Sequence, residues 1–177
     1  MCSSDLDVVH YRCQAELSSV PVSNGKPVSV RPSGGGNWPW TIEEAYEHLF
    51  HGPDFHVLRS LDSIGETSAS ATLNGVQSKE WIGGPWTTDP AALDGGLQVA
   101  LLWGIHQKGR QTLPSAIKSV KFHQADDPSS WVHCDVTTKA IGPYQHTFDI
   151  HLTSPTGQPI VDLIDVNMTV LLSPAKR

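Results

Sequence analysis

The segment "DPAALDGGLQVALLW", residues 89–103, determines the expected fold. Thr88 or Asp89 can cap a helix and Pro90 suits its first position, so the pattern predicts a helix that runs to about Lys108. After its two glycines this helix is apolar on almost every side, which predicts that it is largely buried. A long buried helix needs a sheet or other helices to cover it.

The same segment contains polar residues where burial is expected. Asp94 and Gln98 are four residues apart, so their side chains are neighbours on the helix surface. Gly95 and Gly96 follow the acid, although glycine costs about 1 kcal/mol of helix stability relative to alanine. Close approach of a substrate or of a second backbone would explain such glycines. The segment is therefore a candidate site as well as a core element.

Weaker periodic patterns complete the predicted fold. Thr41 and Glu44 form a capping box for a helix over residues 41–50. Alternating or β-rich segments predict strands near 8–17, 55–64, 66–73, 115–124, 130–141, 145–154 and 159–172. Residues 18–40 are rich in Ser, Pro and Gly and are expected to be a mobile loop of one domain that spans 1–177.

Side-chain alternation predicts which strand faces are buried. In the strand at 145–154, one face contains His146, Phe148, Ile150 and Leu152. In the last strand, one face is expected to contain Ile164, Val166, Met168, Val170 and Leu172. One long helix with a mostly antiparallel sheet predicts an α+β layer fold, and a sheet wrapped around a central helix is the hot-dog arrangement. Periodicity supports α+β without singling out the hot dog.

Composition excludes several classes of function. The net charge of -6 and the lack of a Lys or Arg run argue against nucleic-acid binding. No stretch approaches the roughly 20 apolar residues of a membrane helix. Three widely spaced cysteines predict no disulfide framework and a cytoplasmic location. Histidine and cysteine spacings predict no metal site, and neither a GxSxG nucleophile elbow nor a phosphate-binding loop is present.

Three segments together resemble a known family. They are "EEAYEHLFHGPDFHVLRSL" (43–61), "TTDPAALDGGLQVALLW" (87–103) and "LPSAIKSVKFH" (113–123). In this order they resemble polyketide synthase dehydratase domains, and "LFHGPDF" looks closest to synthases that make polyunsaturated fatty acids. The resemblance covers about residues 41–172.

The resemblance implies a place within a double hot dog. Such dehydratases carry a catalytic His in an HxxxGxxxxP motif of the N-terminal half and a catalytic Asp in the C-terminal half. This sequence lacks that His motif, so it is expected to be a C-terminal half. The chain alone would then be inactive if the catalytic His must come from the other half. It departs from the family at Asp89, often His, and at His51, often Tyr.

The resemblance also implies roles for single residues. Asp94 matches the acid that protonates the leaving hydroxyl of a 3-hydroxyacyl chain. Gln98 would orient either the Asp94 carboxyl group or the substrate hydroxyl. His51 is either a base or cover for the acyl tunnel, or a histidine that only interacts with the end of its helix. The candidate substrate contacts are Tyr46, Gly52, Pro53, Phe55, Gly95, Leu97 and Pro114. The alternative for Tyr46 is a core position, and for Pro53 and Phe55 it is to fix the turn and fill the core.

Partners and rival functions follow from the same resemblance. The substrate would be held on the phosphopantetheine of an acyl carrier protein, and no other cofactor is expected. The domain would pair with an N-terminal hot-dog half or with a second copy of itself, because a single hot dog exposes a sheet edge. The rival functions are a non-catalytic acyl-binding or structural element of the synthase and a homodimeric acyl thioesterase.

Overall fold

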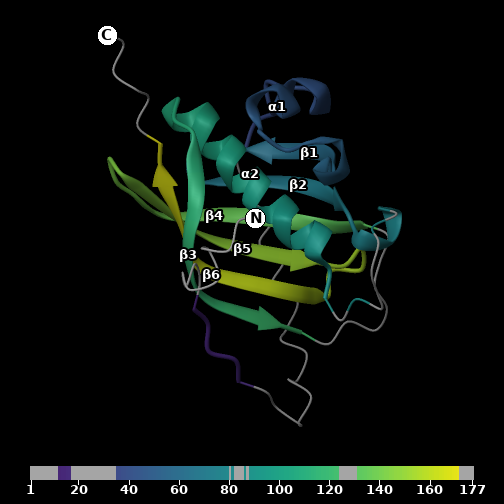
Figure 1. Ribbon diagram of the computed structural model, residues 1–177. Coiled ribbons are helices and arrows are strands. Elements are labelled where there is room, and N and C mark those ends of the chain that lie inside the picture. The colour runs from purple at the N-terminus through teal and green to yellow at the C-terminus, as the bar shows by residue number, and fades with distance from the viewer. Residues whose placement is uncertain are drawn as a thin grey trace, which may run out of the picture.

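The apolar helix identified in the sequence lies across one face of an antiparallel sheet (Figure 1). The computed structural model describes residues 12–16, 35–79, 81, 86, 88–123 and 131–171. Its elements are α1 (Ile42–His48), the 3₁₀ helix η1 (Pro53–Phe55), β1 (Leu58–Ile64), β2 (Ser68–Asn74), the 3₁₀ helix η2 (Val76–Ser78), α2 (Pro90–Lys108), β3 (Thr112–Phe122), β4 (Trp131–Ile141), β5 (Gln145–Thr153) and β6 (Pro159–Val170). The six strands have the order β1-β2-β4-β5-β6-β3. This arrangement confirms the α+β hot-dog prediction.

Helix α2 begins and ends where its capping residues predict. The Asp89 carboxylate accepts from the backbone N–H of Ala92 at 2.9 Å and also from that of Val76 at 3.0 Å. Gly109 ends the helix with φ of 61°, a left-handed conformation that glycine adopts without strain. The helix thereby presents a buried surface to the inner face of the sheet.

The two glycines of α2 allow the helix to pack closely on the sheet. A Cβ at Gly95 would lie 2.8 Å from Leu73 Cδ1 and 3.0 Å from Val57 Cγ2. A Cβ at Gly96 would lie 2.9 Å from Ile150 Cγ2. Both positions therefore face the core, and the glycines let α2 approach buried side chains of the sheet and of the segment before β1.

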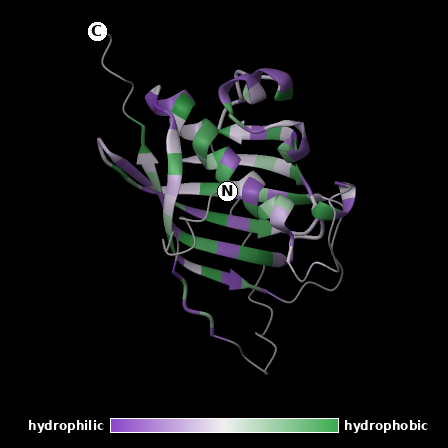
Figure 2. Ribbon diagram, in the orientation of Figure 1, coloured by the Kyte–Doolittle hydropathy of each residue, from purple (hydrophilic) through white to green (hydrophobic). Residues whose placement is uncertain are grey.

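Strand alternation is confirmed in β5 and broken in β6. Figure 2 shows hydrophobic and hydrophilic residues alternating along the strands. All four residues predicted for the inner face of β5 are buried. In β6 the buried residues are Val161 and Leu163, followed by Val166, Met168 and Val170. The prediction that Ile164 shares a face with Val166 is therefore wrong, and Leu172 lies outside the described residues.

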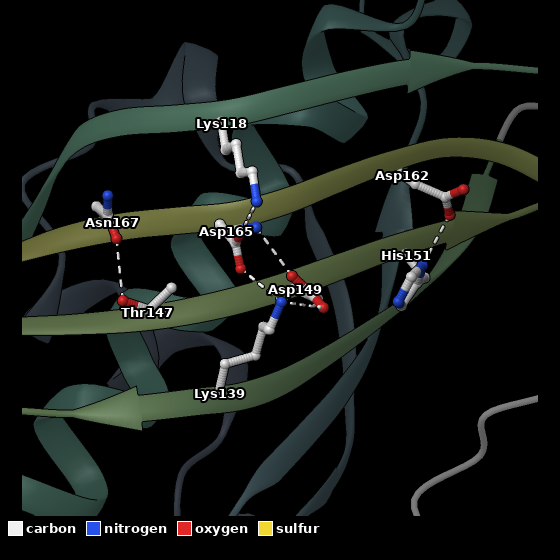
Figure 3. A network of polar contacts seen from close by, with 8 residues as sticks. All are labelled: Lys118, Lys139, Thr147, Asp149, His151, Asp162, Asp165 and Asn167. Atoms are coloured by element: carbon white, nitrogen blue, oxygen red, sulfur yellow. Dashed lines mark hydrogen bonds and ion pairs between the residues drawn. The ribbon is translucent and has the colours of Figure 1, made fainter.

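A β-bulge at Asp165 causes this change of face. Phe148 pairs with Val166 but Ile150 pairs with Leu163, so β6 has one extra residue between these pairs. Asp165 has φ of 52°, and its N–H donates to the Asp149 carboxylate at 2.9 Å. Figure 3 shows the ion pairs that surround the bulge, in which Lys118 and Lys139 contact Asp165 from the two flanking sides.

The N-terminal predictions meet the described residues only in part. Residues 12–16 are exposed and form no strand, so the predicted strand over 8–17 is wrong at these residues, with which no strand of the described part pairs. Its other residues, and residues 18–34 of the predicted loop, lie outside the described part. Residues 35–40 pack on the domain: Gly36 bridges Ile64, and the buried Trp38 donates through Nε1 to the Ser70 carbonyl at 3.2 Å.

Two further observations concern the described residues alone. None of their helices has the length and apolar character needed to cross a membrane. Cys13 and Cys134 are both free thiols.

Candidate active site

A cavity of about 370 Å³ lies beside α2, where the α1–β1 connection and the start of β3 approach it. Its lining residues are Phe50, His51, Gly52, Phe55, Asp94, Leu97, Gln98, Leu101 and Pro114. All of them except Phe50 and Leu101, seven residues in total, were predicted from the sequence to be catalytic or to contact substrate. The lining is mainly apolar, and its polar side chains are the imidazole of His51, the carboxyl group of Asp94 and the amide of Gln98.

His51 and Asp94 come together in this wall. His51 Nε2 lies 3.8 Å from Asp94 Oδ2, and the two side chains are 11% and 29% exposed. Burial lowers the pKa of His51 from its ordinary 6.5, the negative charge of Asp94 opposes that shift, and His56 adds to it. The His51 Nδ1 atom is buried and has no hydrogen-bond partner within the described protein. A neutral imidazole beside a carboxyl group can take a proton from a bound molecule.

Gln98, one turn further along α2, holds the Asp94 carboxyl group. Its Nε2 donates to Asp94 Oδ2 at 2.7 Å and to the Phe55 carbonyl at 2.9 Å. Its Oε1 accepts from the Tyr46 hydroxyl at 3.3 Å. Gln98 is fully buried, so these three contacts replace the hydrogen bonds that water would provide.

Three predicted contact residues lie outside the lining. Tyr46 contacts Gln98 and not the cavity. Pro53 is the exposed first residue of η1, and Gly95 faces the sheet. Sequence reasoning missed Phe50 and Leu101, which do line the cavity. Helical periodicity could have identified Leu101, since it is four residues after Leu97. Phe50 directly precedes His51 and stacks on it with ring centroids 4.3 Å apart.

A metal centre has no support in the described part of the chain. No cluster of three or more His, Cys, Asp or Glu side chains there could hold an ion.

Comparisons with known proteins bear on the family and on the fold. A family model described as "Polyketide synthase dehydratase N-terminal domain" matches residues 43–177. That description contradicts the prediction of a C-terminal half, which is therefore wrong. The two halves of a double hot dog have the same fold, so element order and a buried helix do not distinguish them. No curated protein matches the sequence significantly.

Solved structures of dehydratases and of a thioesterase share the fold. The bifunctional dehydratase-cyclase domain in ambruticin biosynthesis has 18% identity and a TM-score of 0.62, and the match covers 80% of this chain and 50% of that one. For the dehydratase domain of RzxB from Pseudomonas fluorescens the values are 17%, 0.60, 76% and 53%. For thioesterase HI1161 from Haemophilus influenzae they are 14%, 0.57, 79% and 98%. The chain thus spans about half the length of the dehydratase chains it matches.

Proposed function

The chain belongs to the polyketide synthase dehydratase family, and on this premise we propose that its cavity eliminates water from a 3-hydroxyacyl thioester. The observation that carries the proposal is the pair formed by His51 Nε2 and Asp94 Oδ2, 3.8 Å apart in an otherwise apolar wall. Dehydration needs a base at the α carbon and an acid at the leaving hydroxyl, and these two side chains supply one of each.

The proposed reaction balances with the two side chains alone. His51 Nε2 takes the α proton, and the C–H electron pair forms the α,β double bond. The bond from the β carbon to its hydroxyl breaks, and Asp94 gives that oxygen a proton, so that water leaves. The proton on His51 then passes to Asp94, which restores the starting state. Lowering of the His51 pKa by burial supports this assignment, because a base must start unprotonated.

The apolar lining suits the acyl chain of the substrate. Leu97 and Leu101 come from α2, and Pro114 comes from β3. Phe50 and Phe55 are 69% and 46% exposed, so apolar side chains extend from the cavity wall to the surface. We propose that the thioester enters there while attached to the phosphopantetheine of an acyl carrier protein. The sequence "LFHGPDF" favours a polyunsaturated fatty acid synthase as its setting.

We propose a second hot-dog domain as the structural partner, since dehydratase relatives contain two halves. The support is the edge strand β3. Ile117, Val120 and Phe122 pair with Val166, Leu163 and Val161, which are all buried. Directly paired residues share a face of the sheet, so the apolar inner face continues onto β3, where these three residues are exposed.

The test is an assay with short 3-hydroxyacyl and 2-enoyl thioesters, in which enoyl formation and free thiol are followed in the same reaction. We expect wild type to interconvert the two thioesters. Asp94→Asn and His51→Gln should each lower kcat by roughly 10²- to 10⁴-fold. Asp54→Asn makes the same chemical change as Asp94→Asn at an exposed position outside the cavity, and should keep the wild-type rate.

The other outcomes either refute the assignment of the acid or indicate a different function. Full activity of Asp94→Asn would refute the assignment of the acid. Release of free thiol without enoyl formation would indicate a thioesterase. Tight binding of the thioester with no turnover in wild type would indicate an acyl-binding element of the synthase.

A further inference from the structure

We propose that Tyr46 is a positioning residue, which fixes the orientation of the Gln98 amide and, through it, the place of the Asp94 carboxyl group. The proposal rests on the proposed function, in which Asp94 donates a proton to the leaving hydroxyl. Tyr46 lies on α1 and does not line the cavity, so it would act through its neighbours rather than on the substrate.

The direction of the hydrogen bonds follows from the groups involved. The backbone N–H of Leu58 can only donate, and it lies 2.8 Å from the Tyr46 hydroxyl oxygen. That oxygen is therefore an acceptor toward Leu58, and the hydroxyl proton remains available to Gln98 Oε1 at 3.3 Å. Burial raises the pKa of Tyr46 to about 12, so the hydroxyl keeps its proton at any physiological pH.

This donor selects one of the two orientations of the amide. With Oε1 toward Tyr46, the Gln98 NH₂ group faces two acceptors, Asp94 Oδ2 at 2.7 Å and the Phe55 carbonyl at 2.9 Å. A rotation of the amide by half a turn would place its oxygen against both acceptors and its NH₂ group against a donor. Because Gln98 is fully buried, no water can relieve such contacts.

The ring of Tyr46 also supports the other half of the site. It stacks on His56 with centroids 3.7 Å apart and planes inclined by 14°. His56 Nε2 lies 3.2 Å from the His51 carbonyl oxygen, which can only accept, so His56 donates to it. Tyr46 thus contacts both halves of the site. Its hydroxyl contacts Gln98, which holds the acid, and its ring contacts His56, which holds the backbone of the base.

The test separates these two contacts. Tyr46→Phe removes the hydroxyl and keeps the ring, while Tyr144→Phe makes the same change at a residue that is 68% exposed. The first readout is the NMR signal pair of the Gln98 side-chain NH₂ group, which needs no turnover. We expect two distinct, slowly exchanging signals in wild type and in Tyr144→Phe, and faster exchange with a changed chemical shift in Tyr46→Phe.

The second readout is kinetic. Tyr46→Phe should lower kcat on the order of 10- to 100-fold with KM unchanged, because a displaced acid slows the chemical step without weakening binding. Tyr144→Phe should match wild type. An unchanged Gln98 signal in Tyr46→Phe would overturn the proposal, as would a changed signal with a wild-type kcat.

Failure of the proposed function has a different signature. In that case Asp94→Asn would retain the wild-type rate or wild type would not turn over, while the Gln98 signals would still report on Tyr46. If Tyr46→Phe does not fold, wild type alone decides. A Tyr46 hydroxyl proton that is protected from exchange and close to the Gln98 amide supports the proposal, and a freely exchanging one overturns it.

Discussion

His51 is the residue whose chemistry depends most on its surroundings. Its imidazole is only 11% exposed, and burial lowers its pKa more than the neighbouring Asp94 raises it. A group with a lowered pKa stays neutral to a lower pH than a free histidine would. The sequence allowed His51 to be a base or a cover for the acyl tunnel, or a histidine that only interacts with the end of its helix. Its burial and the position of Asp94 beside it favour the base.

We expect the acid limb of the kcat/KM profile to report on His51. Protonation of the imidazole removes the base, so the acid limb due to His51 should begin only below the ordinary value of 6.5. The measurement is kcat/KM from pH 4.5 to 8 on about half-unit steps, with His48→Gln as a control outside the cavity. An acid limb above pH 6.5 would contradict the assignment, because the folded pKa would then be raised rather than lowered.

Gln98 should contribute strongly to stability as well as to the site. Gln98→Ala removes a fully buried side chain and leaves Tyr46, Asp94 and the Phe55 carbonyl without its contacts. We expect the free energy of unfolding to fall by roughly 2–5 kcal/mol, the range for large-to-small changes in a core. Urea denaturation measures it.

Gln107→Ala is the matched control for that change. Gln107 lies on the same helix, is only partly buried and makes one bond, to the Gly65 carbonyl at 3.2 Å. Its replacement should cost about 1 kcal/mol. Equal losses in the two variants would mean that the Gln98 network adds nothing to an ordinary helix contact.

Helix α2 was predictable because its signals are local. Asp89, Pro90 and Gly109 mark its ends by their own chemistry, and Asp94 with Gln98 stand out against its apolar residues. The bulge at Asp165 has no such signal, since it depends on the Asp149 carboxylate of the neighbouring strand. The alternation in β6 therefore predicted the wrong face for Ile164.

The site divides in the same way as the fold. Asp94 and Gln98 lie one helical turn apart, so spacing alone places them together. His51 is brought to Asp94 by the packing of the α1–β1 connection on α2, which no local pattern specifies. Tyr46 was a candidate substrate contact with a core position as its alternative, and its observed hydrogen bonds to Gln98 and Leu58 depend on that same packing.

The glycines of α2 provide a test of how closely the helix packs on the sheet. Gly95→Ala gains helix propensity but places a Cβ 2.8 Å from Leu73 and 3.0 Å from Val57, both fully buried. Overpacking costs typically 1–3 kcal/mol and should exceed the propensity gain of about 1 kcal/mol. We expect a lower melting temperature by calorimetry.

Gly104→Ala is the control on the same helix. Its Cβ would have no neighbour nearer than the Arg110 carbonyl at 3.6 Å, an ordinary contact distance. This variant should gain up to about 1 kcal/mol in stability. Stabilisation of both variants would show that the sheet yields at Gly95, and that the glycine there is not required for packing.

At the scale of the whole molecule, the two edges of the sheet differ. Gly36 forms a bridge to Ile64 and so partly covers the β1 edge. No described segment pairs with the outer edge of β3, whose side chains are exposed along most of its length. An uncovered edge strand with apolar side chains favours association with another chain. The edge of β3 is therefore the expected contact with a second hot-dog domain.

We expect the purified chain to self-associate through β3 when no other hot-dog domain is present. Val120→Lys places a charge among the exposed apolar residues of that strand and should raise the dissociation constant at least tenfold, which corresponds to about 1.4 kcal/mol. Ile141→Lys introduces the same charge at a comparably exposed residue of β4, 44% against 40%, and should leave association unchanged. Sedimentation equilibrium over a range of concentrations measures both. Equal weakening by the two variants would indicate general charge repulsion in place of a specific edge contact, and a wild type that stays monomeric at every concentration would mean that β3 does not pair with its own copy.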